Sequence, residues 1–218
     1  MQLRVGCAPD LPLQRLQGFL GLLSTRHVEL DVDVVHLPSG TQIARLHEGD
    51  LDLGLVHETG WADGVPTERA YRGEAMATVV SLAHRITTRA TPQLADLAGD
   101  VLLVVPDRAE PGVHARVVEL AESSGARFHA IREAPGADPR DLLFAVASGG
   151  GVAFAPISAV PAAGPLGDAV TTRSVGPVHR MPNTCVAFRP DSSPELSEVC
   201  ASAREVARYL YGVSNDWA

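Results

Sequence analysis

Residues 37–56, LPSGTQIARLHEGDLDLGLV, decide the fold, because this one stretch holds a helix start, a helix, its end and a strand. Ser39 is the expected N-cap and Gln42, three residues on, its partner, so a capping box is predicted. This arrangement leaves the backbone N–H groups of Gly40 and Thr41 at the tip of the helix. Such a tip binds polar or anionic groups, which predicts one wall of a small-molecule site.

The rest of the stretch predicts how the helix ends and how the chain continues. Gly49 follows the last helical residues and supplies a left-handed stop, after which leucines alternate along a strand at positions 51, 53 and 55. The same order of elements returns at Asp138–Ala155, where Asp138 is the expected cap, Pro139 the first helical residue and Gly149 the stop. The chain therefore contains two similar α/β units.

Hydrophobic periodicity outlines both units. The first contains strands at Leu3–Cys7 and Asp31–His36, a helix at Leu11–Leu23, and the quoted stretch. The second contains strands at Val101–Val105, Arg127–Ile131 and Gly151–Ala155, with helices at Pro111–Ser123 and Asp138–Ser148. Met181–Phe188 and the helix Pro194–Tyr211 are expected to complete the first unit.

This pattern predicts an α/β fold of two Rossmann-like lobes with mostly parallel sheets. Strands at Ala75–Ala83 and Ala169–Val175 are expected to join the lobes as a two-strand hinge. The predicted boundaries are residues 1–78 plus 175–218 for lobe I and residues 79–174 for lobe II. A doubly wound lobe binds ligands beyond the carboxyl ends of its strands, so an interlobe cleft is the expected binding site.

Composition excludes several classes of function. The formal net charge is −8 and all 18 basic residues are arginine, so no basic stripe for nucleic acid is expected in this chain. Cys7, Cys185 and Cys200 lack metal-like spacing and are expected to be buried thiols, although a redox role for Cys7 is the competing hypothesis. The histidines, including His36, His47 and His57, show no ligand spacing, and neither a metal nor a cofactor is predicted.

Motifs for catalysis, export and membrane insertion are also missing from the sequence. HExxH, GxSxG, GxxxxGK and GxGxxG do not occur, so no enzyme activity is expected. The start, MQLRVGCAPD, does not resemble a signal peptide, and prolines such as Pro156 interrupt the charge-free stretch 142–167. A cytoplasmic protein without membrane contact is predicted.

Four segments serve as landmarks along the sequence: LRVGCAP at the start, SGTQIARLHEGDLDLGLV, LADLAGDVLLVVP and AVASGGGVAFAPISAV. In their order and spacing they resemble the effector-binding domain of LysR-type transcriptional regulators, a type 2 periplasmic-binding fold. The resemblance implies an inducer sensor whose full-length protein carries an N-terminal winged helix-turn-helix for DNA binding. That domain is expected to be absent from this chain, since no room exists for it before Leu3.

The resemblance also implies a set of effector contacts, one group at each of four positions in the fold. The first group is Asp10 and Leu11, and the second is Ser39, Gly40 and Thr41. The third group is Pro111, Gly112 and Val113, and the fourth is Gly149 and Gly150. Asp10 departs from the neutral residue common in the family, and either caps the helix expected from Leu11 or contacts the ligand. Its carboxylate is expected to disfavour an anionic effector by a few kcal/mol at most, at an effective dielectric of about 20.

Two other functions share this layout, and the resemblance also implies an oligomer. A solute-binding protein of a transporter is the alternative, but it requires export; an enzyme requires a catalytic set that is not evident in the sequence. The family implies a homodimer or homotetramer in which the first helix packs on the second-lobe helix Pro111–Ser123 of another copy. Phe19, Leu20 and Leu23 could serve that contact or face their own sheet.

Overall fold

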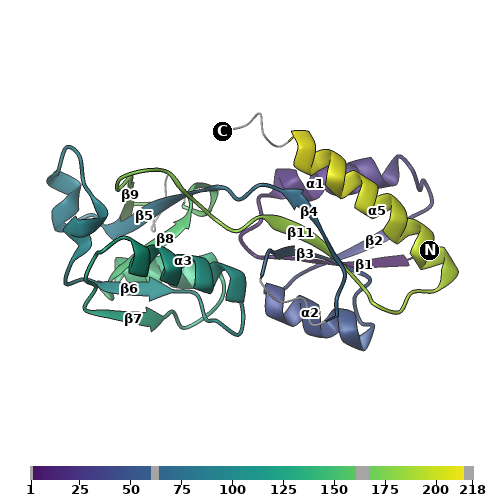
Figure 1. Cartoon of the computed structure of the whole chain (residues 1–218), viewed down its shortest axis with the longest axis horizontal. Coiled ribbons are helices and arrows are strands. Elements are labelled where there is room, and N and C mark those ends of the chain that lie inside the picture. The colour runs from purple at the N-terminus through teal and green to yellow at the C-terminus, as the bar shows by residue number, and fades with distance from the viewer. Residues whose placement is uncertain (1, 60–63, 161–166, 214–218) are drawn as a thin grey trace. The chain divides into compact units, whose positions relative to one another are not determined.

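The computed structural model describes residues 2–59, 64–160 and 167–213. It divides into two compact units, Met1–Gly73 with Pro182–Ala218 as unit 1 and Glu74–Met181 as unit 2 (Figure 1). The predicted α/β fold class is confirmed, and the structure contains one sheet of five strands and one of six. The chain changes unit after Gly73 and after Met181, whereas the sequence placed these changes after residues 78 and 174.

Unit 1 is built on a mixed sheet of order β2-β1-β3-β11-β4. Its strands are β1 (Gln2–Cys7), β2 (Asp31–His36), β3 (Leu53–His57), β4 (Thr67–Tyr71) and β11 (Thr184–Phe188). β1 pairs in parallel with β2 and β3, while β11 pairs antiparallel with β3 and β4. Four strands therefore run in one direction and β11 alone runs in the other.

Three helices cover the two faces of this sheet (Figure 1). α1 (Leu13–Ser24) and α5 (Pro194–Val213) lie on one face, and α2 (Ser39–Glu48) lies on the other. The alternation along β3 explains this division, because Leu53 and Leu55 join the core under α1 and α5 while Val56 joins the core under α2. Each face of the strand is thus buried, as the uninterrupted apolar run requires.

The first helix differs from its sequence prediction in two respects. It begins at Leu13, with Pro12 in the N-cap position, and not at Leu11. Leu13 is 59% exposed, whereas Phe19 is fully buried and Leu23 nearly so, both within the core of unit 1. Phe19 and Leu23 therefore face their own sheet and do not form an exposed contact surface.

The predicted capping box at the start of α2 is wrong. Ser39 is the first residue of the helix, Pro38 takes the N-cap position and no side chain caps the helix. The Ser39 hydroxyl instead accepts a hydrogen bond from the His57 N–H at 3.1 Å. Long-range partners have displaced the local capping pattern, although the predicted stop at Gly49 is confirmed by its φ of 79°.

Unit 2 is also built on a mixed sheet, of order β10-β5-β8-β6-β7, with β9 pairing β5 in addition. Its strands are β5 (Ala75–Ser81), β6 (Val101–Val104), β7 (Ala130–Glu133), β8 (Val152–Pro156), β9 (Val170–Arg173) and β10 (His179–Arg180). β5 is antiparallel to its partners β8, β9 and β10, and β6 pairs in parallel with β7 and β8. Because β5 has all these partners in unit 2, it belongs wholly to that unit.

The helices of unit 2 largely follow the sequence prediction. They are α3 (Pro111–Ser123) and α4 (Pro139–Ala147), with 3₁₀ turns at Arg85–Thr88, Leu94–Leu97 and Ile157–Ala159. The expected cap of α4 is confirmed, since the Asp138 carboxylate accepts a hydrogen bond from the Arg140 N–H at 2.8 Å. Gly149 follows α4 with a φ of 78°, as predicted.

The charge-free stretch 142–167 contains the end of α4 and the buried strand β8. Its residues 161–166 lie outside the described part of the chain. Among the helices of the described residues, none combines the length and the apolar character that crossing a membrane requires.

Candidate functional site

Three polar side chains gather where the parallel strands of unit 1 end. Asp10 follows β1, Ser39 follows β2 and His57 is the last residue of β3. Since β1 pairs in parallel with both β2 and β3, the carboxyl ends of the three strands share one edge of the sheet. This edge is where doubly wound folds bind ligands. We call these three residues the carboxyl-edge cluster.

Asp10 and His57 form a close pair within this cluster. His57 Nε2 lies 2.7 and 2.9 Å from the two carboxylate oxygens of Asp10, whose side chain is 11% exposed. Burial by itself raises the pKa of Asp10, but the charge and hydrogen bond of His57, with a contribution from Arg15, hold that pKa below its ordinary value. The Asp10 carboxylate is therefore ionised and already partnered, and it does not cap a helix.

Ser39 connects this pair to the start of α2. Its hydroxyl accepts the His57 N–H, so the end of β3 and the first turn of α2 are fixed to each other. Gly40 is half-buried and Thr41 exposed on that turn, and the backbone bond Gln42 N–H to Pro38 O comes only after them. The N–H groups of Gly40 and Thr41 thus precede the first intrahelical hydrogen bond. Leu11, by contrast, is a core residue with 8% exposure.

A small cavity of about 70 Å³ adjoins the cluster within unit 1. Ser39 and His57 form part of its wall, and residues of α2, β3, β4 and β11 and the two residues after β3 form the rest. The lining residues are Ser39, Ile43, Val56, His57, Glu58, Thr59, Thr67 and Cys185. Its volume exceeds the roughly 30 Å³ that one water molecule occupies in the liquid, so it accommodates a small polar group.

The predicted contacts in unit 2 do not all lie together. Pro111, Gly112 and Val113 form the first turn of α3, which follows the carboxyl end of β6 as expected. Gly149 and Gly150 instead precede β8, and β8 pairs in parallel with β6. They therefore lie at the amino edge of the sheet, and one site within unit 2 cannot combine them with the start of α3.

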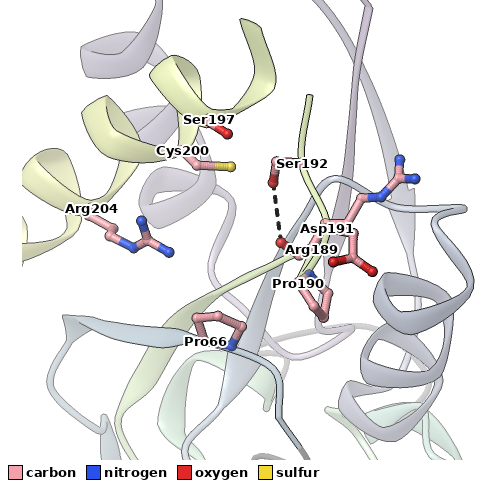
Figure 2. A pocket seen from close by; sticks show the side chains of 8 residues that line it. All are labelled: Pro66, Arg189, Pro190, Asp191, Ser192, Ser197, Cys200 and Arg204. Carbon is pink, nitrogen blue, oxygen red and sulfur yellow. Dashed lines mark hydrogen bonds between the residues drawn. The ribbon is translucent and has the colours of Figure 1, made fainter. Parts of the chain in front are cut away.

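A larger cavity, of about 510 Å³, lies at the opposite edge of the unit 1 sheet (Figure 2). Ser197, Cys200 and Arg204 project into it from α5, and the segment Arg189–Ser192 after β11 forms another side. Phe188, the residue before that segment, pairs with Leu53 at the start of β3, which places this cavity at the amino edge. It is thus distinct from the carboxyl-edge cluster.

The three cysteines are buried free thiols, as expected from the sequence. Burial, reinforced by the negative charge of Asp10, raises the pKa of Cys7 to about 12. Burial likewise raises the pKa of Cys185 to about 12. Such thiols stay protonated, which argues against a redox-sensing role. Within residues 2–59, 64–160 and 167–213, no group of three or more His, Cys, Asp or Glu side chains is placed to hold a metal ion.

A family model described as "LysR substrate binding domain" matches residues 1–208. The chain belongs to this family. The match covers both units, and it agrees with the resemblance of the four sequence segments to LysR-type effector-binding domains. None of the curated proteins compared with the chain matches it.

Solved structures of LysR-type domains share this fold. The reduced form of the OxyR regulatory domain from Pseudomonas aeruginosa has a TM-score of 0.67 and 18% identity, covering 96% of this chain and 95% of that chain. The CcmR regulatory domain from Synechocystis PCC6803, in complex with 2-PG, has a TM-score of 0.70 and 13% identity over 96% and 99%. The BenM effector-binding domain with its effector benzoate has a TM-score of 0.65 and 17% identity over 95% and 92%.

His57 is the residue of the cluster that sequence reasoning missed. It was considered only as a metal ligand, and no local pattern links it to Asp10, which lies 47 positions away. Its place as the last residue of a strand was the usable signal, because strand ends collect at the ligand-binding edge. The predicted contacts Asp10 and Ser39 do meet at this edge, through His57.

Proposed function

We propose that this LysR substrate binding domain senses a small-molecule effector at the carboxyl-edge cluster of unit 1. The observation that carries the proposal is the connection of Asp10, His57 and Ser39 at the start of α2. Fixed polar groups beside a helix N-terminus, at the carboxyl edge of a parallel sheet, suit recognition of a polar ligand group. The start of α3 in unit 2 and an interlobe cleft remain predictions of the family resemblance.

A small organic acid is the class of effector that we propose. Asp10 alone would repel an anion, but both of its carboxylate oxygens already lie within hydrogen-bond distance of His57 Nε2. The N–H groups of Gly40 and Thr41 then offer donors to a carboxylate. Benzoate, which the BenM domain binds, belongs to this chemical class.

The proposed output is a change in the assembly of a larger regulator. An effector shifts a conformational equilibrium only if it binds two arrangements unequally, so its differential affinity sets the response. We propose that the domain acts as a homodimer or homotetramer in the cytoplasm, that DNA is contacted through an N-terminal domain of a longer protein, and that no catalysis takes place. Membership of the LysR family supports this proposal over transport of a solute.

A thermal-shift screen of small organic acids, including benzoate and shikimate, tests the proposal. A ligand at 100 times its dissociation constant stabilises the folded state by about 2.7 kcal/mol, which raises the melting temperature measurably. The shift should shrink in His57→Gln and Ser39→Ala, which remove two side chains of the cluster. It should persist in Ser197→Ala, whose residue lines the cavity at the other edge. Mass spectrometry should recover the ligand unchanged.

Two outcomes would contradict the proposal. A shift that survives both cluster variants but disappears in Ser197→Ala would move the site to the amino-edge cavity. Conversion of the ligand by the purified chain would make the protein an enzyme.

A further inference from the structure

The chain passes between its two units at only two places, after Gly73 and after Met181. On the unit 1 side, the side chain of Asn183 connects both places. Its Oδ1 accepts a hydrogen bond from the Gly73 N–H at 3.2 Å, and its Nδ2 donates to Glu58 Oε2 at 2.6 Å. These partners fix the orientation of the amide, because one donates and the other accepts.

The backbone of Asn183 adds a third link. Its carbonyl oxygen accepts a hydrogen bond from the Glu58 N–H at 2.7 Å. Glu58 is held further by Arg69, whose Nε donates to Glu58 Oε1 at 2.7 Å. The residue after β3 is therefore bound to the second crossover by both its backbone and its carboxylate.

A corresponding set of bonds holds the crossovers on the unit 2 side. The Glu74 carbonyl accepts a hydrogen bond from the Met181 N–H at 2.8 Å. The Glu74 carboxylate accepts two more from Ser158, one from the backbone N–H at 2.6 Å and one from the hydroxyl at 2.7 Å. Each crossover is thus tied to the other within each unit, and to the end of a strand.

The position of Glu58 connects these bonds to the candidate site. Glu58 directly follows His57, whose side chain pairs with Asp10 and whose N–H bonds Ser39. A ligand that shifts the backbone of His57 is expected to shift Glu58 as well, because the two residues share a planar peptide unit. The displacement then reaches Gly73 through the two hydrogen bonds of the Asn183 side chain.

We propose that Asn183 is a positioning residue that couples the carboxyl-edge cluster to the two crossovers between the units. It contacts no proposed ligand position, and its side-chain bonds set how the crossovers lie relative to the end of β3. Without these side-chain bonds, a displacement of Glu58 is transmitted less to Gly73, and the relative arrangement of the units becomes less restricted. The role in effector response rests on the function proposed above, whereas the restriction of the crossovers does not.

Distance measurement between spin labels tests the proposal without any ligand. Labels are placed at Val28→Cys in unit 1 and Phe144→Cys in unit 2, where the native side chains are 88% and 57% exposed. The native thiols are buried and should not be labelled. Dilution with unlabelled protein keeps distances between different copies out of the signal. Asn183→Ala should broaden the distance distribution relative to the parent.

Exchanging the amide of Asn183 with the carboxylate of Glu58 tests whether their hydrogen bond can be restored. Asn183→Asp keeps the acceptor for the Gly73 N–H but faces the Glu58 carboxylate, so it should broaden the distribution. Adding Glu58→Gln restores a donor opposite the new carboxylate and should narrow the distribution again. Arg208→Gln, which breaks the ion pair of Arg208 with Glu68 elsewhere in unit 1, is the matched control and should leave the distribution unchanged.

Circular dichroism and melting curves identify variants that have merely lost their fold. The coupling is overturned if a folded Asn183→Ala protein has the same distance distribution as the parent. It is also overturned if adding Glu58→Gln to Asn183→Asp does not narrow the distribution. If an effector is found, Asn183→Ala should still bind it but lose its effect on the distance. If no small molecule binds the parent while the distance results hold, the proposed function fails and the restriction of the crossovers stands.

Discussion

At the residue scale, the Asp10–His57 pair decides the electrostatics of the candidate site. From the sequence, Asp10 either caps the first helix or contacts the ligand. The structure rules out the cap, because α1 begins at Leu13, and it places His57 Nε2 within hydrogen-bond distance of both Asp10 oxygens. A buried carboxylate whose two oxygens are engaged by an imidazole is held in place and is not free to pair with a ligand group.

The pair also predicts a specific pH dependence of stability. The pKa of Asp10 is lowered in the folded state, so its ionised form stabilises the protein above the unfolded-state pKa of about 3.9. This contribution is lost as the pH falls through the folded-state pKa. Asp10→Asn should therefore lower the free energy of unfolding by about 1–3 kcal/mol near neutral pH, and the deficit should shrink below about pH 4.

Urea unfolding from about pH 6 to about pH 3 measures this difference. Asp33→Asn is a suitable control, since Asp33 is exposed on β2. A deficit for Asp10→Asn that stays constant across the whole range would show that the carboxylate charge does not stabilise the fold.

The limits of sequence reasoning at this scale are physical. The Ser39 and Gln42 spacing correctly located the helix, since a serine before an amphipathic run favours a helix start. It did not reveal the hydrogen bonds, because Ser39 bonds a residue 18 positions away and Gln42 bonds Leu55. Partners from other strands are invisible to local patterns, and the site depends on them.

At the element scale, one glutamine fixes α2 on the sheet. Gln42 Nε2 donates to the carbonyl oxygens of Leu37 and Leu55, at 2.7 and 3.2 Å. The same side chain lies against two glycines of β1 and β3, and a Cβ added at Gly6 or Gly54 would stand 2.6 or 2.7 Å from Gln42 Oε1. These glycines are required for close approach of a fully buried side chain, and not for an unusual backbone conformation.

Gly54→Ala should therefore destabilise unit 1. The added methyl group forces Gln42 out of its place, and overpacking of this kind costs about 1–3 kcal/mol. Denaturant unfolding measures the loss, and Gly212→Ala is the control because a Cβ at Gly212 meets nothing within 4 Å. Combined with Gln42→Ala, the substitution at Gly54 should cost less than it does alone, because the clashing amide is gone. Strictly additive losses would contradict this account.

Elements were predicted well where periodicity was strong and poorly where pairing decided the outcome. The sequence located α2, α3, α4 and α5 and most of the strands to within a few residues. β7 begins at Ala130, three residues later than predicted, because its register with β6 runs from Val101 opposite Ala130. Gly149 and Gly150 were placed in the site by resemblance, but the parallel pairing of β8 with β6 puts them at the other edge.

At the scale of the whole molecule, the repeated element order predicted two units but not where the chain changes unit. The point where the chain changes unit depends on β5, which the sequence predicts to be a strand that leaves the first lobe. Its pairing with β8, β9 and β10 places the entire strand in unit 2. Such pairings join residues about 75 to 105 positions apart, so only the folded chain reveals them.

Burial of all three thiols yields a prediction for the whole molecule. A thiol with a pKa of about 12 is ionised to about one part in ten thousand at pH 8, and burial also raises the pKa of Cys200. The native protein should therefore react very slowly with a disulfide reagent, and all three thiols should react at once in denaturant. Rapid reaction of one thiol in the native state would reopen a redox role.

The place of β11 in the unit 1 sheet also determines the order in which the units can form during synthesis. β11 lies between β3 and β4, yet it is the last to be synthesised of the strands in the described residues. Until residues 184–188 emerge, β3 lacks its neighbour and α5 has not been made. Unit 2 is continuous in the chain and is complete by Met181. Since domains fold as units, unit 2 should fold first, and unit 1, whose strands come from both sides of unit 2 in the sequence, should be completed afterwards.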